Sequence, residues 1–298
     1  MRSICVAHLV RAKNGIEPLR RFLESYARNQ GGIEHDLLLI FKGFHKKELP
    51  AQYRQLLGRY PHQALFVDDK GYDIVPYFIA ANRFEYDYFC FLNSFSIILD
   101  EQWLTKMHNH ITRPGVGLVG ATGSYQSTYT DLLNSPKIQS RLLWRRMVGT
   151  MLLPLLILKC RRDFYPYPNY HIRTNAYMIA GDLMRKIKVG PIHRKWDCYT
   201  FESGREGLTH QILRKNLRAL VVGKNGRAYE KEEWVNSFSF WQGDQGNLLV
   251  ADNQTNAYTT GDLETKWKYA RHAWADRANP LAIFDNGPQM EFKEHTCV

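Results

Sequence analysis

The chain has 298 residues, of which 44% are hydrophobic and 13% aromatic, and its formal net charge is +11. This composition excludes a disordered chain, because disordered segments are poor in apolar and aromatic residues. The excess of positive charge favours a negatively charged partner, such as nucleic acid, anionic lipid headgroups or a phosphate-bearing substrate. The sequence shows no helix-turn-helix, zinc-finger or RNP pattern, so we expect no nucleic-acid partner.

Strand-like and helix-like segments alternate along the first 121 residues. We predict strands at 4–10, 36–44, 64–67, 86–99 (interrupted at 93–94) and 116–121, and helices at 16–29, 50–60, 73–84 and from Asp100 onward. Short strands separated by helices are typical of an α/β fold with a mostly parallel sheet and helices on both faces. We assign residues 1–230 to this domain and residues 231–298 to a C-terminal extension packed on it.

Polar turns follow three of the predicted strands, at 11–15, 68–73 and 93–96. Ligands of parallel sheets bind outside the carboxyl ends of the strands, so we expect the three turns to lie along one rim. An alternative is that Asp69 is only a turn residue and that Asp73 only caps the helix that follows it.

The cysteines and the N-terminal residues indicate the cellular compartment of the protein. Five cysteines are far apart and form no C-x-x-C pair, which predicts neither a zinc site nor a disulfide framework. The opening residues carry one charge and lead into a run that Arg11 and Lys13 interrupt, which indicates a first strand rather than a signal peptide. We therefore expect a cytoplasmic protein, peripheral on the inner face of a membrane if the next segment binds lipid.

An apolar and basic insertion occupies residues 141–170. Its apolar run, 147–158, is flanked by arginines and lysines and is shorter than the ~20 residues that span a bilayer. Tyr165, Tyr167 and Tyr170 follow it, as amphipathic rings do at a membrane interface. This pattern predicts a helix lying on an anionic membrane surface. The alternatives are a buried core helix and a dimer contact.

Residues 67–77 (VDDKGYDIVPY) and 86–94 (YDYFCFLNS) resemble a pattern of GT-A-fold glycosyltransferases, most closely the rhamnan-synthesis-type branch. In that branch a G-x-D-I segment precedes a Y-D-Y strand and a metal-site turn. Residues 7–15 are similar to the first nucleotide-contacting loop of family-2 transferases, and the resemblance covers residues 4 to 125. It implies a GT-A-like, Rossmann-like fold and an enzyme that moves a sugar from a nucleotide-diphosphate donor to a hydroxyl of a surface polysaccharide or lipid-linked glycan.

The resemblance also implies site residues. Residues 173–179 look like the acceptor-side strand, and Glu202 lies where such enzymes carry a catalytic carboxylate, which would deprotonate the acceptor and invert the anomeric centre. The implied donor-binding residues are Val10, Arg11, Asp68, Asp69, Gly71, Asp73, Asn93, Ser94 and Ser96, and the acceptor-binding ones are Arg173, Asn175, His193 and Asp197. Alternatively, Glu202 is only a solvated carboxylate at a helix N-terminus, and Arg173 and Asn175 only form an exposed strand face.

The chain departs from the family at the metal motif. The Asp-x-Asp position reads Asn93-Ser94-Phe95-Ser96, and these weak, uncharged ligands argue against tightly held Mn²⁺ or Mg²⁺. Three alternatives stay open. Basic side chains such as Arg11, Lys13 or Arg173 neutralise the diphosphate without a metal, Asp68 or Asp69 holds the metal, or the protein is a non-catalytic nucleotide-sugar-binding or membrane-peripheral scaffold.

Residues 241–255 form a polar, glycine-containing segment near the end of the chain. Such a segment can close over a bound donor as a lid, but a β-hairpin turn is the more ordinary structure and the one we predict. The tryptophans of the tail are expected to pack it against the main sheet, and they are Trp234, Trp241, Trp267 and Trp274.

Overall fold

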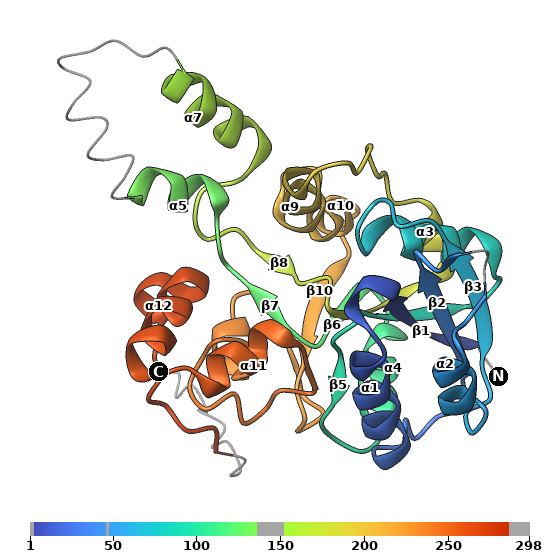
Figure 1. The fold of residues 1–298 in the computed structure, drawn as a ribbon. Helices are drawn as coiled ribbons and strands as arrows, with labels where there is room; N and C mark the ends of the chain where they lie inside the picture. The colour runs from blue at the N-terminus through green and yellow to red at the C-terminus, as the bar shows by residue number, and fades with distance from the viewer. Residues whose placement is uncertain (1–2, 46–47, 136–151, 286–298) are drawn as a thin grey trace.

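The computed structural model describes residues 3–45, 48–135 and 152–285 (Figure 1). Its centre is an eight-stranded sheet in the order β11-β10-β6-β9-β4-β1-β2-β3. The strands are β1 (Ile4–Arg11), β2 (Asp36–Lys42), β3 (Gln63–Val67), β4 (Tyr88–Leu92), β6 (Val116–Gly120), β9 (Ala176–Ala180), β10 (Arg218–Val222) and β11 (Ala228–Tyr229). Strand β9 is antiparallel to both of its neighbours and β11 to β10, while the other pairs are parallel. The predicted mostly parallel sheet is confirmed.

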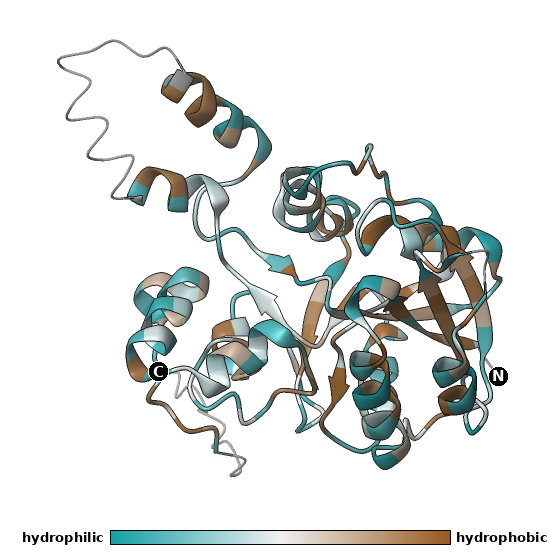
Figure 2. Cartoon of the chain, viewed as in Figure 1, coloured by the Kyte–Doolittle hydropathy of each residue, from teal (hydrophilic) through white to brown (hydrophobic). Residues whose placement is uncertain are grey.

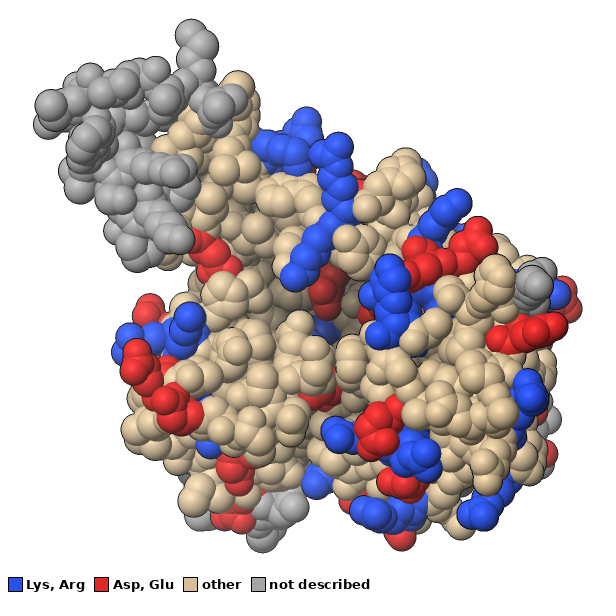
Figure 3. Space-filling view, in the orientation of Figure 1, with Lys and Arg blue, Asp and Glu red and all other residues tan. Residues whose placement is uncertain are grey.

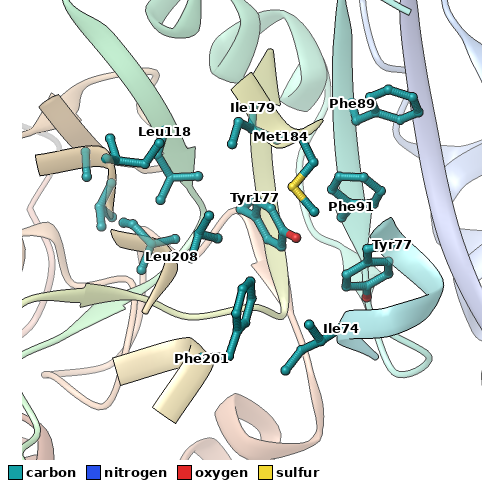
Figure 4. Close-up of a cluster of buried hydrophobic side chains, with 14 of the residues drawn as sticks. Ile74, Tyr77, Phe89, Phe91, Leu118, Tyr177, Ile179, Met184, Phe201 and Leu208 are labelled. Carbon is teal, nitrogen blue, oxygen red and sulfur yellow. The ribbon is translucent and has the colours of Figure 1, made fainter. Parts of the chain in front are cut away.

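Helices cover both faces of this sheet, which explains why its strands are apolar at consecutive positions. Alternate residues of β1 belong to two separate buried clusters. One cluster includes side chains of α1 (Glu17–Arg28), α2 (Ala51–Leu57) and α4 (Trp103–Ile111). The other, shown in Figure 4, includes side chains of α3 (Ile74–Arg83), α8 (Gly181–Arg185), α9 (Lys195–Ser203) and α10 (Leu208–Leu213).

The elements predicted before residue 121 are confirmed with small shifts of their ends. The strand expected over 86–99 is divided into β4 and the short β5 (Ile97–Ile98) by a tight turn between them. The helix expected from Asp100 begins at Trp103. Asp73 precedes α3, but its side chain makes no capping hydrogen bond, so the prediction that it serves as a side-chain cap is wrong.

The C-terminal segment packs against the sheet. Trp234, in the 3₁₀ helix η3 (Trp234–Ser237), and Trp274, at the end of α12 (Leu263–Trp274), are fully buried in the cluster that contains Tyr177 of β9. The β-hairpin predicted for 241–255 is wrong. Its strand β12 (Val250–Ala251) pairs antiparallel with β5, more than a hundred residues earlier, and leads into α11 (Asn253–Thr260).

A helical arm projects from the body (Figure 1). It contains α5 (Thr128–Asn134) and α7 (Leu152–Asp163), and β7 (Gly123–Ser124) and β8 (His171–Ile172) join it to the sheet. The apolar run before Leu152 lies outside the described residues. In the described part the buried-core alternative is wrong, because Leu155 and Leu158 are exposed.

Two of the tyrosines that follow the arm belong to the body of the protein. Tyr167 Oη donates a hydrogen bond to the carbonyl of Trp274 (2.7 Å), and Tyr170 packs edge-on against Trp234. No helix within the described ranges has the length and apolarity needed to cross a membrane.

Candidate functional site

The first pocket lies at the carboxyl ends of β1, β2 and β3. β1 ends at Arg11 and β2 ends at Lys42, while Asp69 lies two residues after the end of β3. The cavity measures about 570 Å³, and residues 190–193 contribute to its lining. It is lined by Arg11, Lys13, Lys42, Asp69, Lys70, Gly71, Tyr72, Val75, Gly190, Pro191, Ile192 and His193.

Four charged side chains form what we call the basic cluster: Arg11, Lys13, Lys42 and Asp69. The Asp69 carboxylate accepts two hydrogen bonds from the Arg11 guanidinium, at 2.9 and 3.1 Å. It also lies 3.3 Å from Lys13 Nζ and 3.5 Å from Lys42 Nζ. The Arg11 hydrogen bond is the main reason that the pKa of Asp69 falls to about 2. With three cations to one carboxylate, the cluster is suited to bind an anion.

Lys42 is the least exposed member of the cluster, with 2% of its side chain accessible. Its Nζ donates a hydrogen bond to the carbonyl of Tyr72 (2.7 Å), and burial lowers its pKa. Lysine is seldom fully buried without a specific partner or role. No sequence pattern singled out Lys42 beforehand, although a charged residue that ends an otherwise apolar strand indicates a position at the carboxyl rim of a sheet.

The loop that carries Asp69 and Asp73 turns through two consecutive left-handed residues, Gly71 (φ 67°) and Tyr72 (φ 50°). A Cβ on Gly71 would lie 2.1 Å from Val75 Cγ2, so glycine is required there. Tyr72 is not a glycine, and its conformation is strained unless the surroundings enforce it. The hydrogen bond from Lys42 to its carbonyl does so and leaves the ring 41% exposed at the pocket.

The second pocket lies between the arm and the C-terminal helices, where Figure 3 shows this face of the molecule hollowed near its centre, with acidic and basic side chains reaching in. It also measures about 570 Å³. It is lined by Ser124, Gln126, Thr128, Asp131, His171, Arg173, Tyr199, Glu202, Ser203, Phe240, Trp241, Asn253, Gln254, Ala257, Tyr269 and His272.

Glu202 reaches this second pocket from the last turn of α9, so the alternative that it sits at a helix N-terminus is wrong. Its Oε1 accepts hydrogen bonds from Thr174 N (2.9 Å) and Thr174 Oγ1 (3.4 Å). These bonds fix the carboxylate, and among the described residues none involves Oε2, which is left to accept a proton from a ligand. Tyr199 lies one turn earlier in α9 and is exposed beside it.

A stacked column forms one wall of the second pocket. The Arg173 guanidinium lies 4.2 Å from the Phe240 ring centroid, Phe240 stacks on Trp241 at 4.4 Å, and Trp241 stacks on Tyr269 at 4.5 Å. Arg173 is buried and donates to Asp252 Oδ2 (2.8 Å), so it is neither an exposed strand residue nor part of the basic cluster. The column therefore ties the chain around β8 to the C-terminal segment.

The pKa of Asp73 responds to charged side chains of both pockets. Its carboxyl is partly buried, and burial is the main reason that its pKa is raised. The charge of Lys42 opposes this rise and the charge of Glu202 adds to it. Asp73 is thus within electrostatic reach of both the basic cluster and Glu202, and its side chain is not used to cap α3.

The turn at the metal-motif position does not fit a divalent cation. Asn93 Oδ1 accepts hydrogen bonds from Phe95 N (2.9 Å) and Ser96 Oγ (3.2 Å), while Ser94 and Ser96 are buried. Within residues 3–45, 48–135 and 152–285, no three His, Cys, Asp or Glu side chains are grouped to hold a metal. Asp69 is already paired with cations, and Asp68 is exposed near Lys70. We therefore assign no chemical step to a metal.

The remaining predicted residues have structural roles or only partial access. Val10 is buried in the core, so its side chain does not reach the first pocket. Asn175 is buried and accepts a hydrogen bond from Thr122 Oγ1 (2.6 Å), so it is not an exposed strand residue either. The Asp197 carboxylate accepts from the backbone amides of His193 and Arg194, which leaves His193 as the member of this pair that lines the first pocket.

Comparisons with known proteins return distant glycosyltransferases. No protein-family model matches the chain, and no curated protein is significantly similar to it in sequence. Similar solved structures include the mannosyltransferase PcManGT from Pyrobaculum calidifontis in complex with GDP-Man and Mn²⁺ (11% identity, 77% of this chain, 57% of that chain, TM-score 0.45). Another is S. aureus TarS 1-349 (11% identity, 67% of this chain, 54% of that chain, TM-score 0.40). A third is glucosyl-3-phosphoglycerate synthase from Mycobacterium tuberculosis in complex with Mn²⁺, UDP and phosphoglyceric acid (15% identity, 61% of this chain, 56% of that chain, TM-score 0.35).

These proteins belong to the class of enzyme that the sequence resembles. This chain spans a little over half the length of each of them.

Proposed function

We propose that this protein is a glycosyltransferase that moves a sugar from a nucleoside-diphosphate donor in the first pocket to a hydroxyl of a glycan in the second. The observation that carries this proposal is the pairing of an anion-binding pocket with a neighbouring cleft that contains a fixed carboxylate. Residues 190–193 line the first pocket and lead directly into α9, whose Tyr199 and Glu202 line the second, so one short stretch of chain reaches both pockets. Residues 1–230 would form the transferase domain, and 231–298 would complete the acceptor cleft with Trp241, Asn253 and Tyr269.

In the proposed reaction the Glu202 carboxylate takes the proton of the acceptor hydroxyl. The acceptor oxygen bonds to the anomeric carbon as the bond from that carbon to the diphosphate oxygen breaks, and the anomeric centre inverts. The nucleoside diphosphate leaves with the bonding electron pair. Cations that already face the developing charge stabilise it in the transition state.

The lining of the second pocket suits a sugar acceptor. Tyr199 offers an exposed ring on which a sugar can pack, and Gln126, Asn253 and Gln254 offer amide groups to hydroxyls. We propose a surface polysaccharide or a lipid-linked glycan as the acceptor.

Glu202→Gln is the direct test of this function, with Glu206→Gln as the matched control, because Glu206 is exposed and paired with Arg214 outside the pocket. We expect Glu202→Gln to lower turnover by ~10²- to 10⁴-fold. Donor binding, followed as the rise in melting temperature with a panel of nucleotide sugars, should stay unchanged in both variants. Normal turnover in Glu202→Gln would remove the assignment of the base. Donor binding without turnover in the wild type would favour a non-catalytic scaffold.

We also propose that α7 brings the protein to the inner face of a membrane, where a lipid-linked acceptor would lie. In Figure 2 the arm carries hydrophobic turns on α7, and Leu155 and Leu158 are 60% and 62% exposed. Lys159, Arg161 and Arg162 follow them in the same helix and are also exposed. Exposed leucines next to basic side chains are typical of helices that lie on anionic lipid.

A further inference from the structure

We propose that the diphosphate of the donor is neutralised by Lys42, Arg11 and Lys13 and not by a divalent metal ion. This inference rests on the proposed function, because it names the groups that would hold the donor of that reaction. It gives Lys42 a role in binding the donor and in stabilising the leaving group.

The first step of the argument is the chemistry at the position where a metal would be held. Mg²⁺ and Mn²⁺ prefer carboxylate oxygens, and the turn after β4 supplies an asparagine and two serines. The Asn93 oxygen is already occupied by two hydrogen bonds within the turn. No other group of three suitable ligands occurs in the described part of the chain.

The second step is the charge that the first pocket already holds. Asp69 is the acidic side chain that lines it, and Arg11, Lys13, Lys42 and Lys70 are its basic ones. The Asp69 carboxylate accepts two hydrogen bonds from Arg11, but its oxygens lie farther from Lys13 Nζ and Lys42 Nζ, at 3.3 and 3.5 Å. The cations of the pocket therefore exceed its carboxylates, as an anionic ligand requires.

The third step is the placement of Lys42. An ammonium group has three N–H donors, and the Tyr72 carbonyl takes one of them at 2.7 Å. The same bond holds Tyr72 in its left-handed conformation, so the lysine also shapes the rim of the pocket. A buried lysine at the carboxyl end of a strand that has a parallel neighbour on each side is placed where ligands of such sheets bind.

Isothermal titration calorimetry with UDP, GDP and inorganic pyrophosphate tests the proposal, once in excess EDTA and once with Mn²⁺. We expect at least one of these ligands to bind with the same affinity under both conditions. Lys42→Met should weaken that binding by ~10- to 100-fold, the range for a lost hydrogen bond to a charged group. Lys13→Gln should weaken it less, because this side chain is 74% exposed and the interaction is screened.

Lys215→Gln is the matched control, since Lys215 is exposed and precedes β10, which lies next to the edge strand β11 on the opposite side of the sheet. Circular dichroism shows whether Lys42→Met is folded, and if it is not, Lys13→Gln carries the test. Binding that requires Mn²⁺, or that neither lysine variant weakens, overturns this inference and leaves the transferase proposal standing. Failure of every ligand to bind under both conditions overturns the transferase proposal, and this inference with it.

Discussion

His8 shows how a single buried side chain can make folding depend on pH. It lies on β1, where its ring stacks on Phe22 with 3.7 Å between centroids and 5° between planes. Neither ring nitrogen has a hydrogen-bond partner among the described residues, and burial lowers the pKa of His8 to about 3. The imidazole is therefore neutral in the folded protein and acts as an apolar ring in the core between β1 and α1.

We predict that His8→Leu makes the free energy of unfolding less dependent on pH. A folded-state pKa below the unfolded value of about 6.5 means that stability is complete above pH 6.5 and is lost as pH falls toward 3, because the unfolded chain takes up the proton first. Between pH 6.5 and 5.5 the wild type should lose about 1 kcal/mol more than His8→Leu.

Urea unfolding of both proteins at the two pH values measures this difference. His110, His171 and His210 also have lowered pKa values, but they are present in both proteins and cancel in the comparison. Equal pH dependence of the two proteins would show that His8 does not contribute.

Residue type and strand position together predict part of the site. The sequence selects Arg11, Asp69 and Glu202, and the structure places the first two in the first pocket and Glu202 in the second. It does not select Lys42, because a lysine at the end of a strand usually lies in solvent. Its burial depends on the left-handed turn at Tyr72, a contact thirty residues away that no local pattern reveals.

At the scale of the elements, the ion pair between Arg173 and Asp252 joins the segment after β8 to the start of α11. Asp252 Oδ2 accepts from Arg173, while Oδ1 accepts from the backbone amides of Gln254 and Thr255 and so caps the helix. The side chains of Arg173 and Asp252 are both buried. Removing one partner of such a pair leaves an uncompensated charge in the interior, which is strongly destabilising.

We predict that Asp252→Asn lowers the free energy of unfolding by about 3 kcal/mol, as measured by urea denaturation. Asparagine caps helices as well as aspartate does, so the loss reports the ion pair rather than the cap. Asp262→Asn is the matched control, because the Asp262 side chain also caps a helix, by accepting a hydrogen bond from Thr265 N at the start of α12, but is exposed. If the two variants lose equal stability, the buried pair does not hold the C-terminal segment in place.

The sequence predicts elements well where the signal is local. Before residue 121, the spacing of apolar residues within each segment is enough to distinguish a buried strand from an amphipathic helix. Residues 241–255 look like a hairpin turn for the same local reason, and that prediction is wrong because β12 pairs with β5. Trp241 and Gln245 adopt left-handed backbone conformations in this segment, as Phe238 does just before it. The surrounding packing imposes these conformations, and the sequence does not indicate them.

At the scale of the whole molecule, the charge of +11 and the projecting arm act on the same partner in our proposal, an anionic membrane surface. Basic side chains raise the affinity for acidic lipid, and exposed leucines add apolar burial once the protein is bound. These contributions can be separated, because the electrostatic attraction weakens with salt and the apolar one does not. If membrane binding needs both the electrostatic attraction and the apolar burial, it should be lost when only the exposed leucines are replaced by polar residues.

We predict that the protein floats with vesicles containing phosphatidylserine and that Leu155→Ser/Leu158→Ser abolishes this. Leu281→Ser is the control, since Leu281 is 65% exposed but lies far along the chain from α7. Flotation of the control and the wild type should decrease with salt and be absent with neutral lipid. Undiminished flotation of the double variant would show that the described part of α7 is not the membrane contact. Transferase activity on a soluble acceptor should be the same in all three proteins, because the two leucines line neither pocket.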